Sequence, residues 1–343
     1  MGKTSTRTSH SPVFPGAAWA TAAPESQGLN ASDVEAAVGR VHDVSGENGV
    51  DEMLIVRNGL VIREGAQPER RHPVWSCTKS FLSTCLGLLW DDGKVTPDTR
   101  ICDFVPEIGS DYSTVTLEHV ATLTSGFAMD KSPLKPSEPL HAPGAAFHYS
   151  RQPDLLALAL TRAAGRPLAD LFAERIADPT GIGREQMLWK VFMEDRGIPV
   201  NGGSGEPTGN IEITPRALAR FGWLFANDGV WNGQRLISKR YIEYATTART
   251  SPNLPPHDPE AWYADLPGNY GLGWWTNGPK PNGERVWPSA PARTFAAQGN
   301  KNNNCFIIPP WHMTVVRMGQ DKIIGMGLYD RMFELLGKSL ASE

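Results

Sequence analysis

The sequence lacks long apolar runs, clusters of basic residues and an apolar segment near its start. No apolar run approaches the roughly 18 residues that a transmembrane helix requires, so we expect no membrane partner. The formal net charge is −4 and Lys and Arg form no run, so nucleic acid is not expected as a partner either. The polar stretch 1–10 lacks the apolar core of a secretory signal. As given, the chain is therefore predicted to be cytoplasmic, or periplasmic or secreted if a leader was removed.

Cysteine is scarce, and the metal and nucleotide motifs are missing. The four cysteines, Cys77, Cys85, Cys102 and Cys305, form no C-x-x-C pair and no metal-ligand spacing with His. The motifs H-E-x-x-H, G-x-S-x-G, G-x-G-x-x-G and the P-loop are also absent. We therefore expect reduced thiols, no bound metal and no cofactor, and no feature indicates an oligomeric state.

The hydrophobic patterning predicts strands at both ends of the chain and helices between them. Residues 53–56 and 60–63 are β-prone runs joined by Asn58-Gly59, a strong hairpin signal. Further strands are predicted over 270–276, 294–298, 305–308 and 313–318. Helices are predicted from the caps at 30–33 to about 44, and over 76–90, 155–164, 167–177, 215–226 and 326–340.

This order of elements predicts an α+β fold. We expect an antiparallel β-sheet flanked by helices, with an inserted and mostly helical lobe. A chain of 343 residues is long enough for two packed lobes. We expect a loose N-terminal leader over 1–25, an α/β lobe built from 26–100 and 207–343, and the helical lobe from 101–206.

Ser76-Cys77-Thr78-Lys79 is an S-x-x-K motif at the start of the apolar helix predicted over 76–90. Residues three apart share one face of a helix, so the lysine amine can reach the serine hydroxyl. A serine hydroxyl becomes a useful nucleophile when a neighbouring base takes its proton. The alternative is a serine that caps the helix beside a lysine whose stem covers apolar surface.

Tyr149 is a second candidate, because it follows a Pro-Gly turn and precedes the helix predicted over 155–164. A tyrosine hydroxyl held near a lysine can pass a proton to a leaving group. The alternative is that Tyr149 serves only for packing.

These segments, in this order, resemble the serine β-lactamase-like superfamily. That group includes class C β-lactamases, penicillin-binding proteins, family VIII esterases and 6-aminohexanoate-dimer hydrolases, and the resemblance runs from about residue 23 to about residue 335. The segments that carry it are 75–81 with S-x-x-K, 123–127 with Thr-Ser-Gly, 143–150 with the tyrosine of Y-x-N, 214–222, 229–233 and 270–275.

The resemblance implies the fold described above and a covalent acyl-enzyme. Ser76 would attack the substrate, Lys79 and Tyr149 would move protons, and either of the two could be the base. The backbone N–H of Ser76 would form half of the oxyanion hole. Trp75, Phe127 and Tyr149 would line the pocket, together with either Trp189 or Trp274.

The chain departs from the family pattern at two positions. Arg151 stands where Y-x-N has Asn, so it either binds an acidic substrate group or points away as a surface charge. The segment that matches the family's K-T-G motif is Gln298-Gly299-Asn300-Lys301. Gly299 permits close backbone approach, and Asn300 could supply the second oxyanion N–H. Since the family's cation is missing from that strand, we expect an esterase or amidase acting on a small ester or amide.

Two other functions stay open. One is a true β-lactamase or D-amino-acid peptidase. The other is a penicillin-binding or sensor protein on the same scaffold, which would be acylated on Ser76 without turnover. The survival of Ser76, Lys79 and Tyr149 together favours an enzyme.

Overall fold

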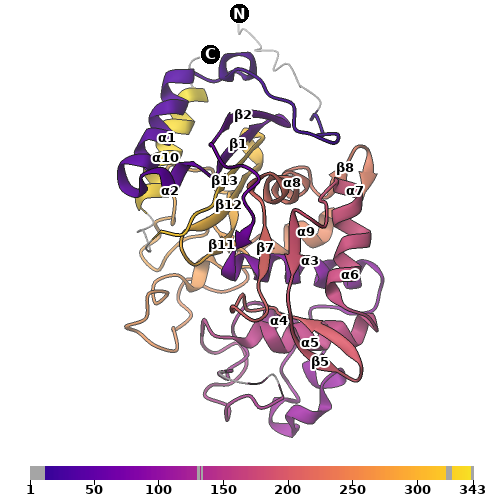
Figure 1. The fold of residues 1–343 in the computed structure, drawn as a ribbon. Coiled ribbons are helices and arrows are strands. Elements are labelled where there is room, and N and C mark those ends of the chain that lie inside the picture. Colours follow the sequence, from indigo (N-terminus) through magenta and orange to yellow (C-terminus); the bar gives the residue numbers. More distant parts are fainter. Residues whose placement is uncertain (1–11, 130–131, 133, 322–326, 341–343) are drawn as a thin grey trace, which may run out of the picture.

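The largest element of the protein is a six-stranded antiparallel sheet with the strand order β10-β11-β12-β13-β1-β2 (Figure 1). The computed structural model describes residues 12–129, 132, 134–321 and 327–340. The strands of this sheet are β1 (Met53–Arg57), β2 (Leu60–Glu64), β10 (Trp275–Thr276), β11 (Phe295–Gly299), β12 (Asn303–Ile308) and β13 (Met313–Arg317). Strands from both ends of the chain therefore form one sheet.

The first hairpin forms where the Asn-Gly signal predicts it. Asn58 and Gly59 have φ angles of 53° and 88°, the left-handed values that a tight hairpin turn requires. Alternate residues of β1 then enter different cores, with Leu54 on one face of the sheet and Ile55 on the other. Ile55 also pairs with Val315 of β13, which joins the two ends of the chain.

Helices cover both faces of the sheet. The helices α1 (Ala31–Ser45) and α10 (Gly327–Leu340) lie side by side on one face, and α8 (Pro215–Ala226) lies on the other (Figure 1). The side chain of Asn30 caps α1 by accepting the backbone N–H of Asp33. The two faces therefore bury separate apolar clusters, one under α1 and α10 and one under α8.

The middle of the chain is mostly helical and packs beside α8. Its central helix is α3 (Thr78–Asp91), which is apolar on nearly all sides and buried from Thr78 to Leu89. The other helices of this part of the chain are α4 (Leu117–Ala121), α5 (Gln152–Ala164), α6 (Leu168–Phe172) and α7 (Asp178–Thr180); α9 (Lys239–Ala245) follows α8, and α2 (Glu47–Val50) follows α1. Short strands complete the fold as β3 (His72–Pro73), β4 (Met187–Trp189), β5 (Val191–Asp195), β6 (Ile198–Asn201), β7 (Ile211–Ile213), β8 (Val230–Trp231) and β9 (Gln234–Arg235).

Several elements differ from the expectations. The strand predicted over 270–276 shrinks to β10, because Gly273 turns at φ 71° and brings the chain against the backbone of Lys79. The helix predicted over 167–177 contains a π-helical turn at Ala173–Ala177. The hairpin β5–β6 was not predicted, although Arg196 and Gly197 form a turn with two positive φ angles.

The segment 12–25 is held against the α/β lobe, in contrast to the loose leader predicted over 1–25. Arg220 of α8 donates to the carbonyl oxygens of Gly16 at 2.7 Å and Ala17 at 3.2 Å. The indole of Trp223 donates to the carbonyl of Val13 at 2.9 Å. These bonds anchor the described part of the segment, and residues 1–11 lie outside the described ranges. The predicted lobe boundaries at 100/101 and 206/207 stay predictions.

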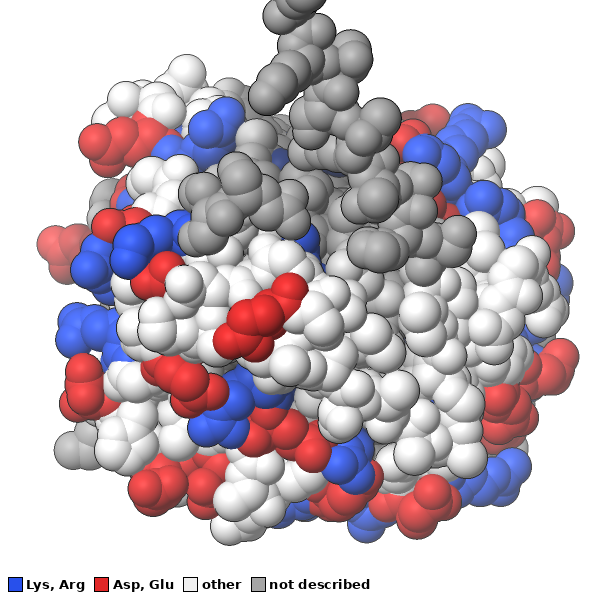
Figure 2. Space-filling view, turned by 90° about the horizontal axis from the view of Figure 1, so that it is seen from above, with Lys and Arg blue, Asp and Glu red and all other residues white. Residues whose placement is uncertain are grey.

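The described helices include none with the length and apolar character needed to cross a bilayer. On the face of the molecule shown in Figure 2, acidic and basic side chains are interspersed around the rim. The described residues near the centre of that face are largely uncharged.

Candidate active site

Ser76 lies in a short 3-10 turn, Trp75–Cys77, that runs directly into α3. Lys79 follows in the first turn of α3, and its side chain is buried. Lys79 Nζ donates to Ser76 Oγ at 2.9 Å and to the carbonyl oxygen of Ser204. The spacing of S-x-x-K therefore brings the two side chains into contact, although Ser76 precedes the α-helix proper. Burial raises the pKa of the adjacent Cys77 thiol, so that Cys77 does not compete as a nucleophile.

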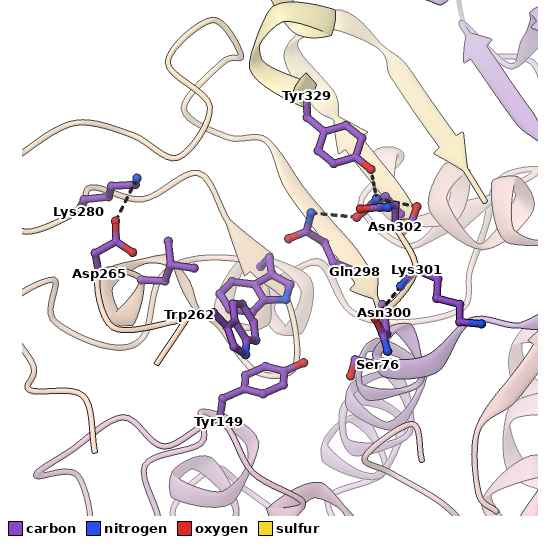
Figure 3. Close-up of a pocket in the computed structure, with 14 residues that line it drawn as sticks. Ser76, Tyr149, Trp262, Asp265, Lys280, Gln298, Asn300, Lys301, Asn302 and Tyr329 are labelled. Atoms are coloured by element: carbon purple, nitrogen blue, oxygen red, sulfur yellow. Dashed lines mark hydrogen bonds and ion pairs between the residues drawn. The ribbon is translucent and has the colours of Figure 1, made fainter. Parts of the chain in front are cut away.

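Tyr149 lies in the loop before α5, and its side chain extends toward Ser76 and Lys79 (Figure 3). The Lys79 Nζ atom lies 4.8 Å from the centre of the Tyr149 ring. The Tyr149 hydroxyl points toward Ser76 (Figure 3). The three residues with predicted catalytic roles are thus brought together by α3 and the loop before α5.

The C-terminal end of β11 packs closely against the turn that carries Ser76. A Cβ atom on Gly299 would lie 2.0 Å from the carbonyl oxygen of Val74 and 3.2 Å from the backbone nitrogen of Cys77. Only glycine, which has no Cβ atom, permits that approach. Gly299 and Asn300 line the same cavity as Ser76.

The cavity in front of Ser76 has a volume of about 650 Å³. One wall is aromatic, with Tyr149, Trp262 and Trp275, and the facing wall carries amide side chains from β11, β12 and the loop between them (Figure 3). Its lining consists of Ser76, Tyr149, Trp262, Asp265, Leu266, Trp275, Lys280, Gln298, Gly299, Asn300, Lys301, Asn302, Asn304 and Tyr329. A cavity of this size suits a small-molecule substrate.

A buried network behind Lys79 was not predicted. Asp154 of α5 is 2% exposed and accepts the backbone N–H groups of Gly203 at 3.0 Å and Ser204 at 2.8 Å. It also accepts the Ser204 hydroxyl at 2.8 Å, and its other neighbour is the Arg151 guanidinium at 3.1 Å. The segment 202–205 reads as a flexible Gly-rich loop in the sequence, yet it is buried and supplies the carbonyl that holds Lys79.

The structure does not bring every predicted pocket residue into the cavity lining. Arg151 pairs with Asp154. Phe127 is buried and packs edge-on to Tyr112, with ring centres 5.1 Å apart. The ring of Trp75 lies under Lys301, with the ammonium 5.9 Å from its centre. The remaining two candidates are also outside the lining, because the Trp189 indole donates to the carbonyl of Gly202 and Trp274 is fully buried in the core.

The aromatic wall and the far end of the cavity include residues that the sequence analysis did not identify as site candidates. Trp262 is 62% exposed and lies in the loop before β10. Tyr329 lies on α10, and Lys301 places a cation directly after Asn300. Among the described residues, no three His, Cys, Asp or Glu side chains gather closely enough to hold a metal ion.

Comparison with known proteins places this arrangement in a family. The family model described as Beta-lactamase matches residues 43–322. The 6-aminohexanoate-dimer hydrolase of Paenarthrobacter ureafaciens is 25% identical over 259 residues, which are 68% of this chain and 65% of that protein. The match therefore spans just under two thirds of the relative's length.

Solved structures share the fold. A putative β-lactamase from Bacteroides dorei superposes with a TM-score of 0.71 at 16% identity, covering 91% of this chain and 99% of that one. A family VIII carboxylesterase superposes with a TM-score of 0.66 at 17% identity, covering 90% of this chain and 97% of that one. The predicted fold class, an antiparallel sheet flanked by helices, is confirmed. Because the family model covers most of the chain, this protein belongs to the β-lactamase family of serine hydrolases.

Proposed function

We propose that this protein hydrolyses a small ester or amide through an acyl-enzyme on Ser76. The observation that carries the proposal is the contact between Lys79 Nζ and Ser76 Oγ, 2.9 Å, at the floor of a cavity large enough for a small substrate. A serine that only capped a helix would not need a buried lysine or an open cavity.

The steps follow from the positions of these groups. Ser76 Oγ bonds to the substrate carbonyl carbon while its proton passes to Lys79 or Tyr149, and the backbone N–H groups of Ser76 and Asn300 stabilise the oxyanion. When the bond to the leaving group breaks, the leaving group takes a proton from Tyr149 or Lys79. Water then attacks the acyl group on Ser76, releases the acid and restores the serine hydroxyl.

An ester or amide substrate is favoured over a β-lactam by the cavity wall. The cavity side chains from β11, β12 and the loop between them include the neutral amides Gln298, Asn302 and Asn304. The cation of this loop, Lys301, comes after Asn300, and β11 itself carries none. The named relatives are a 6-aminohexanoate-dimer hydrolase and a family VIII carboxylesterase, and both names describe cleavage of amides or esters.

The test is intact mass spectrometry after brief exposure to p-nitrophenyl butyrate, with nitrophenol release followed in parallel. We expect a transient acyl adduct in the wild type and none in Ser76→Ala. We expect Lys79→Ala to lower kcat/KM by at least about 100-fold, since general base catalysis supplies that much. Ser26→Ala, an exposed serine, is the control and should behave as the wild type.

A persistent adduct on Ser76 would instead favour the non-turnover sensor. An equal adduct in wild type and Ser76→Ala would contradict the assignment of the nucleophile.

A further inference from the structure

The amide wall of the cavity contains a directed chain of hydrogen bonds. Gln298 Nε2 donates to Asn304 Oδ1 at 2.9 Å, and Asn304 Nδ2 donates to the Tyr329 hydroxyl oxygen at 2.9 Å (Figure 3). The three side chains come from β11, β12 and α10, so they are held by packed elements of the α/β lobe. All three line the cavity that contains Ser76.

The direction of each bond in this chain is set by a backbone carbonyl. Asn304 Nδ2 also donates to the carbonyl oxygen of Asn302 at 2.9 Å. A carbonyl can only accept, so the amide end of Asn304 that faces Asn302 and Tyr329 must be its nitrogen. Asn304 Oδ1 therefore faces Gln298, whose nitrogen must in turn point toward Asn304.

This arrangement leaves one donor and one acceptor open to the cavity. The Tyr329 oxygen already accepts from Asn304, and no described residue accepts the Tyr329 proton. Burial raises the pKa of Tyr329 to about 12, although the nearby Arg317 opposes the shift, so the phenol keeps its proton at neutral pH. Gln298 Oε1 likewise has no partner among the described residues, and it points into the cavity toward the aromatic wall (Figure 3).

The two groups that the hydrogen-bond chain leaves open favour an uncharged ligand at this wall. The cations of the lining lie elsewhere, with Lys280 paired to Asp265 at 3.2 Å and the Lys301 ammonium 5.9 Å from the centre of the Trp75 ring. A carboxylate would meet the lone pairs of Gln298 Oε1, and an ammonium group would meet the hydroxyl proton of Tyr329. A hydroxyl or a carboxamide can satisfy both, since each can donate and accept.

The facing wall suits an apolar linker. Tyr149 contacts Trp262 and Trp275, with ring centres 5.1 Å and 5.8 Å away. These rings offer apolar surface to methylene groups that run between Ser76 and the amide wall.

We propose that Gln298, Asn304 and Tyr329 form a specificity subsite that binds an uncharged hydroxyl or carboxamide at the end of the substrate remote from the scissile bond. The proposal rests on the function proposed above and adds the class of substrate. Asn304 is a positioning residue here, whereas Gln298 and Tyr329 contact the ligand.

The test compares esters that differ only at the remote end. The acyl series is p-nitrophenyl heptanoate, 6-hydroxyhexanoate, adipamate and hydrogen adipate, and the alcohol series is hexyl acetate and the monoacetate of 1,6-hexanediol. In at least one series, we expect the wild type to prefer the hydroxyl- or carboxamide-ended ester over the methyl-ended one by about tenfold in kcat/KM. We expect the carboxylate-ended ester to show no such gain.

Tyr329→Phe should remove this preference. We expect kcat/KM to fall about tenfold for the polar uncharged esters and less than about twofold for the methyl-ended ones, which also shows that the variant folds. Gln298→Met should act in the same direction. Tyr244→Phe is the matched control, because it removes a tyrosine hydroxyl that bonds Glu118 outside the cavity lining, and it should change neither class of ester.

Two outcomes distinguish a failure of the proposed subsite from a failure of the proposed function. Hydrolysis of all esters at similar rates by the wild type, or equal losses for all esters in Tyr329→Phe, would overturn the subsite and leave the hydrolase intact. If the wild type hydrolysed none of them, the proposed function would fail. Calorimetric binding of 1,6-hexanediol monoacetate and hexyl acetate to Ser76→Ala, with and without Tyr329→Phe, would then still decide the subsite, and equal affinities would reject it.

Discussion

A single buried carboxylate, Asp154, organises the backbone that holds the lysine of the S-x-x-K pair. Its two oxygens accept three hydrogen bonds from Gly203 and Ser204, and Arg151 compensates its charge. The carbonyl oxygen of Ser204 then accepts a hydrogen bond from Lys79 Nζ. The position of Lys79 therefore depends on a residue that does not contact the cavity.

Asp154→Asn should reduce both stability and catalysis. The substitution replaces an acceptor oxygen by an N–H₂ group, so at least one N–H or O–H donor of Ser204 loses its partner while Arg151 loses its counter-ion. We expect the free energy of unfolding to fall by roughly 3 kcal/mol, as for other broken buried pairs, and kcat to fall more than KM rises. Urea unfolding and steady-state kinetics measure the two effects. Asp170→Asn, on an exposed side chain of α6, is the control and should change neither.

Gly299→Ala should damage catalysis with the fold retained. The new Cβ atom would lie 2.0 Å from the carbonyl oxygen of Val74, so the end of β11 and the turn carrying Ser76 must separate. A displacement of about 1 Å between catalytic groups can cost about 100-fold in rate, and we expect a loss of kcat of that size. Gly39→Ala, in α1, places its new methyl group where no other atom lies within 4 Å, so it should leave kcat unchanged. Full activity of Gly299→Ala would refute the role of this contact.

At the scale of elements, ion pairs that respond to pH tie α5 to the β5–β6 hairpin and to the 3-10 turn Pro106–Ile108. Arg162 of α5 bonds Asp195 at 2.8 Å and Glu107 at 2.7 Å. The hydrogen bond from Arg162 lowers the pKa of Glu107 from 4.5 to about 2 and also lowers the pKa of Asp195. Both carboxyl groups therefore bind protons less readily in the folded protein than in the unfolded chain.

The ion pairs should stabilise the fold at neutral pH and lose this effect in acid. A carboxyl group with a lowered pKa contributes stability above its unfolded pKa and loses the contribution as pH falls toward its folded pKa. We expect Arg162→Gln to be less stable than the wild type at about pH 6, with the difference shrinking toward about pH 3. Denaturant unfolding over this range measures it. The exposed Arg196, which also pairs with Glu107, is the control, since Arg196→Gln should cost little at any pH.

The elements that were predictable from the sequence are those with local signals. The β1–β2 hairpin follows from Asn58-Gly59, and α3 follows from a run of apolar residues behind a polar start. The π-helical turn at Ala173–Ala177 and the β5–β6 hairpin were missed, because their stability comes from packing and from a turn with a weaker sequence signal.

The same limit applies to the candidate site. Ser76 and Lys79 are three residues apart on one helical run, so their contact follows from helix geometry. Ser204 acts through a backbone carbonyl, which has no side-chain signature. Tyr329 lies on a helix that was predicted, but its approach to Asn304 depends on how α10 docks against β12.

At the scale of the molecule, the segment 13–22 ties the start of the chain to both layers of the α/β lobe. Trp223 and Arg220 of α8 bond its carbonyl groups, and the backbone of Ala22 and Ala20 pairs with Val61 at the edge of β2. An uncovered strand edge can pair with another chain. The segment therefore covers one edge of the main sheet.

The pairing of β1 with β13 has a consequence for biosynthesis. The β1–β2 hairpin leaves the ribosome early, while β13 is among the last elements to emerge. Contacts between such distant parts of a chain form slowly. Throughout translation the nascent hairpin thus has an apolar strand without its neighbour, the kind of exposed surface that chaperones protect. If translation stopped before β13, β1 would have no strand to pair with on that side. Folding of the N-terminal hairpin into the sheet therefore requires the C-terminal part of the chain.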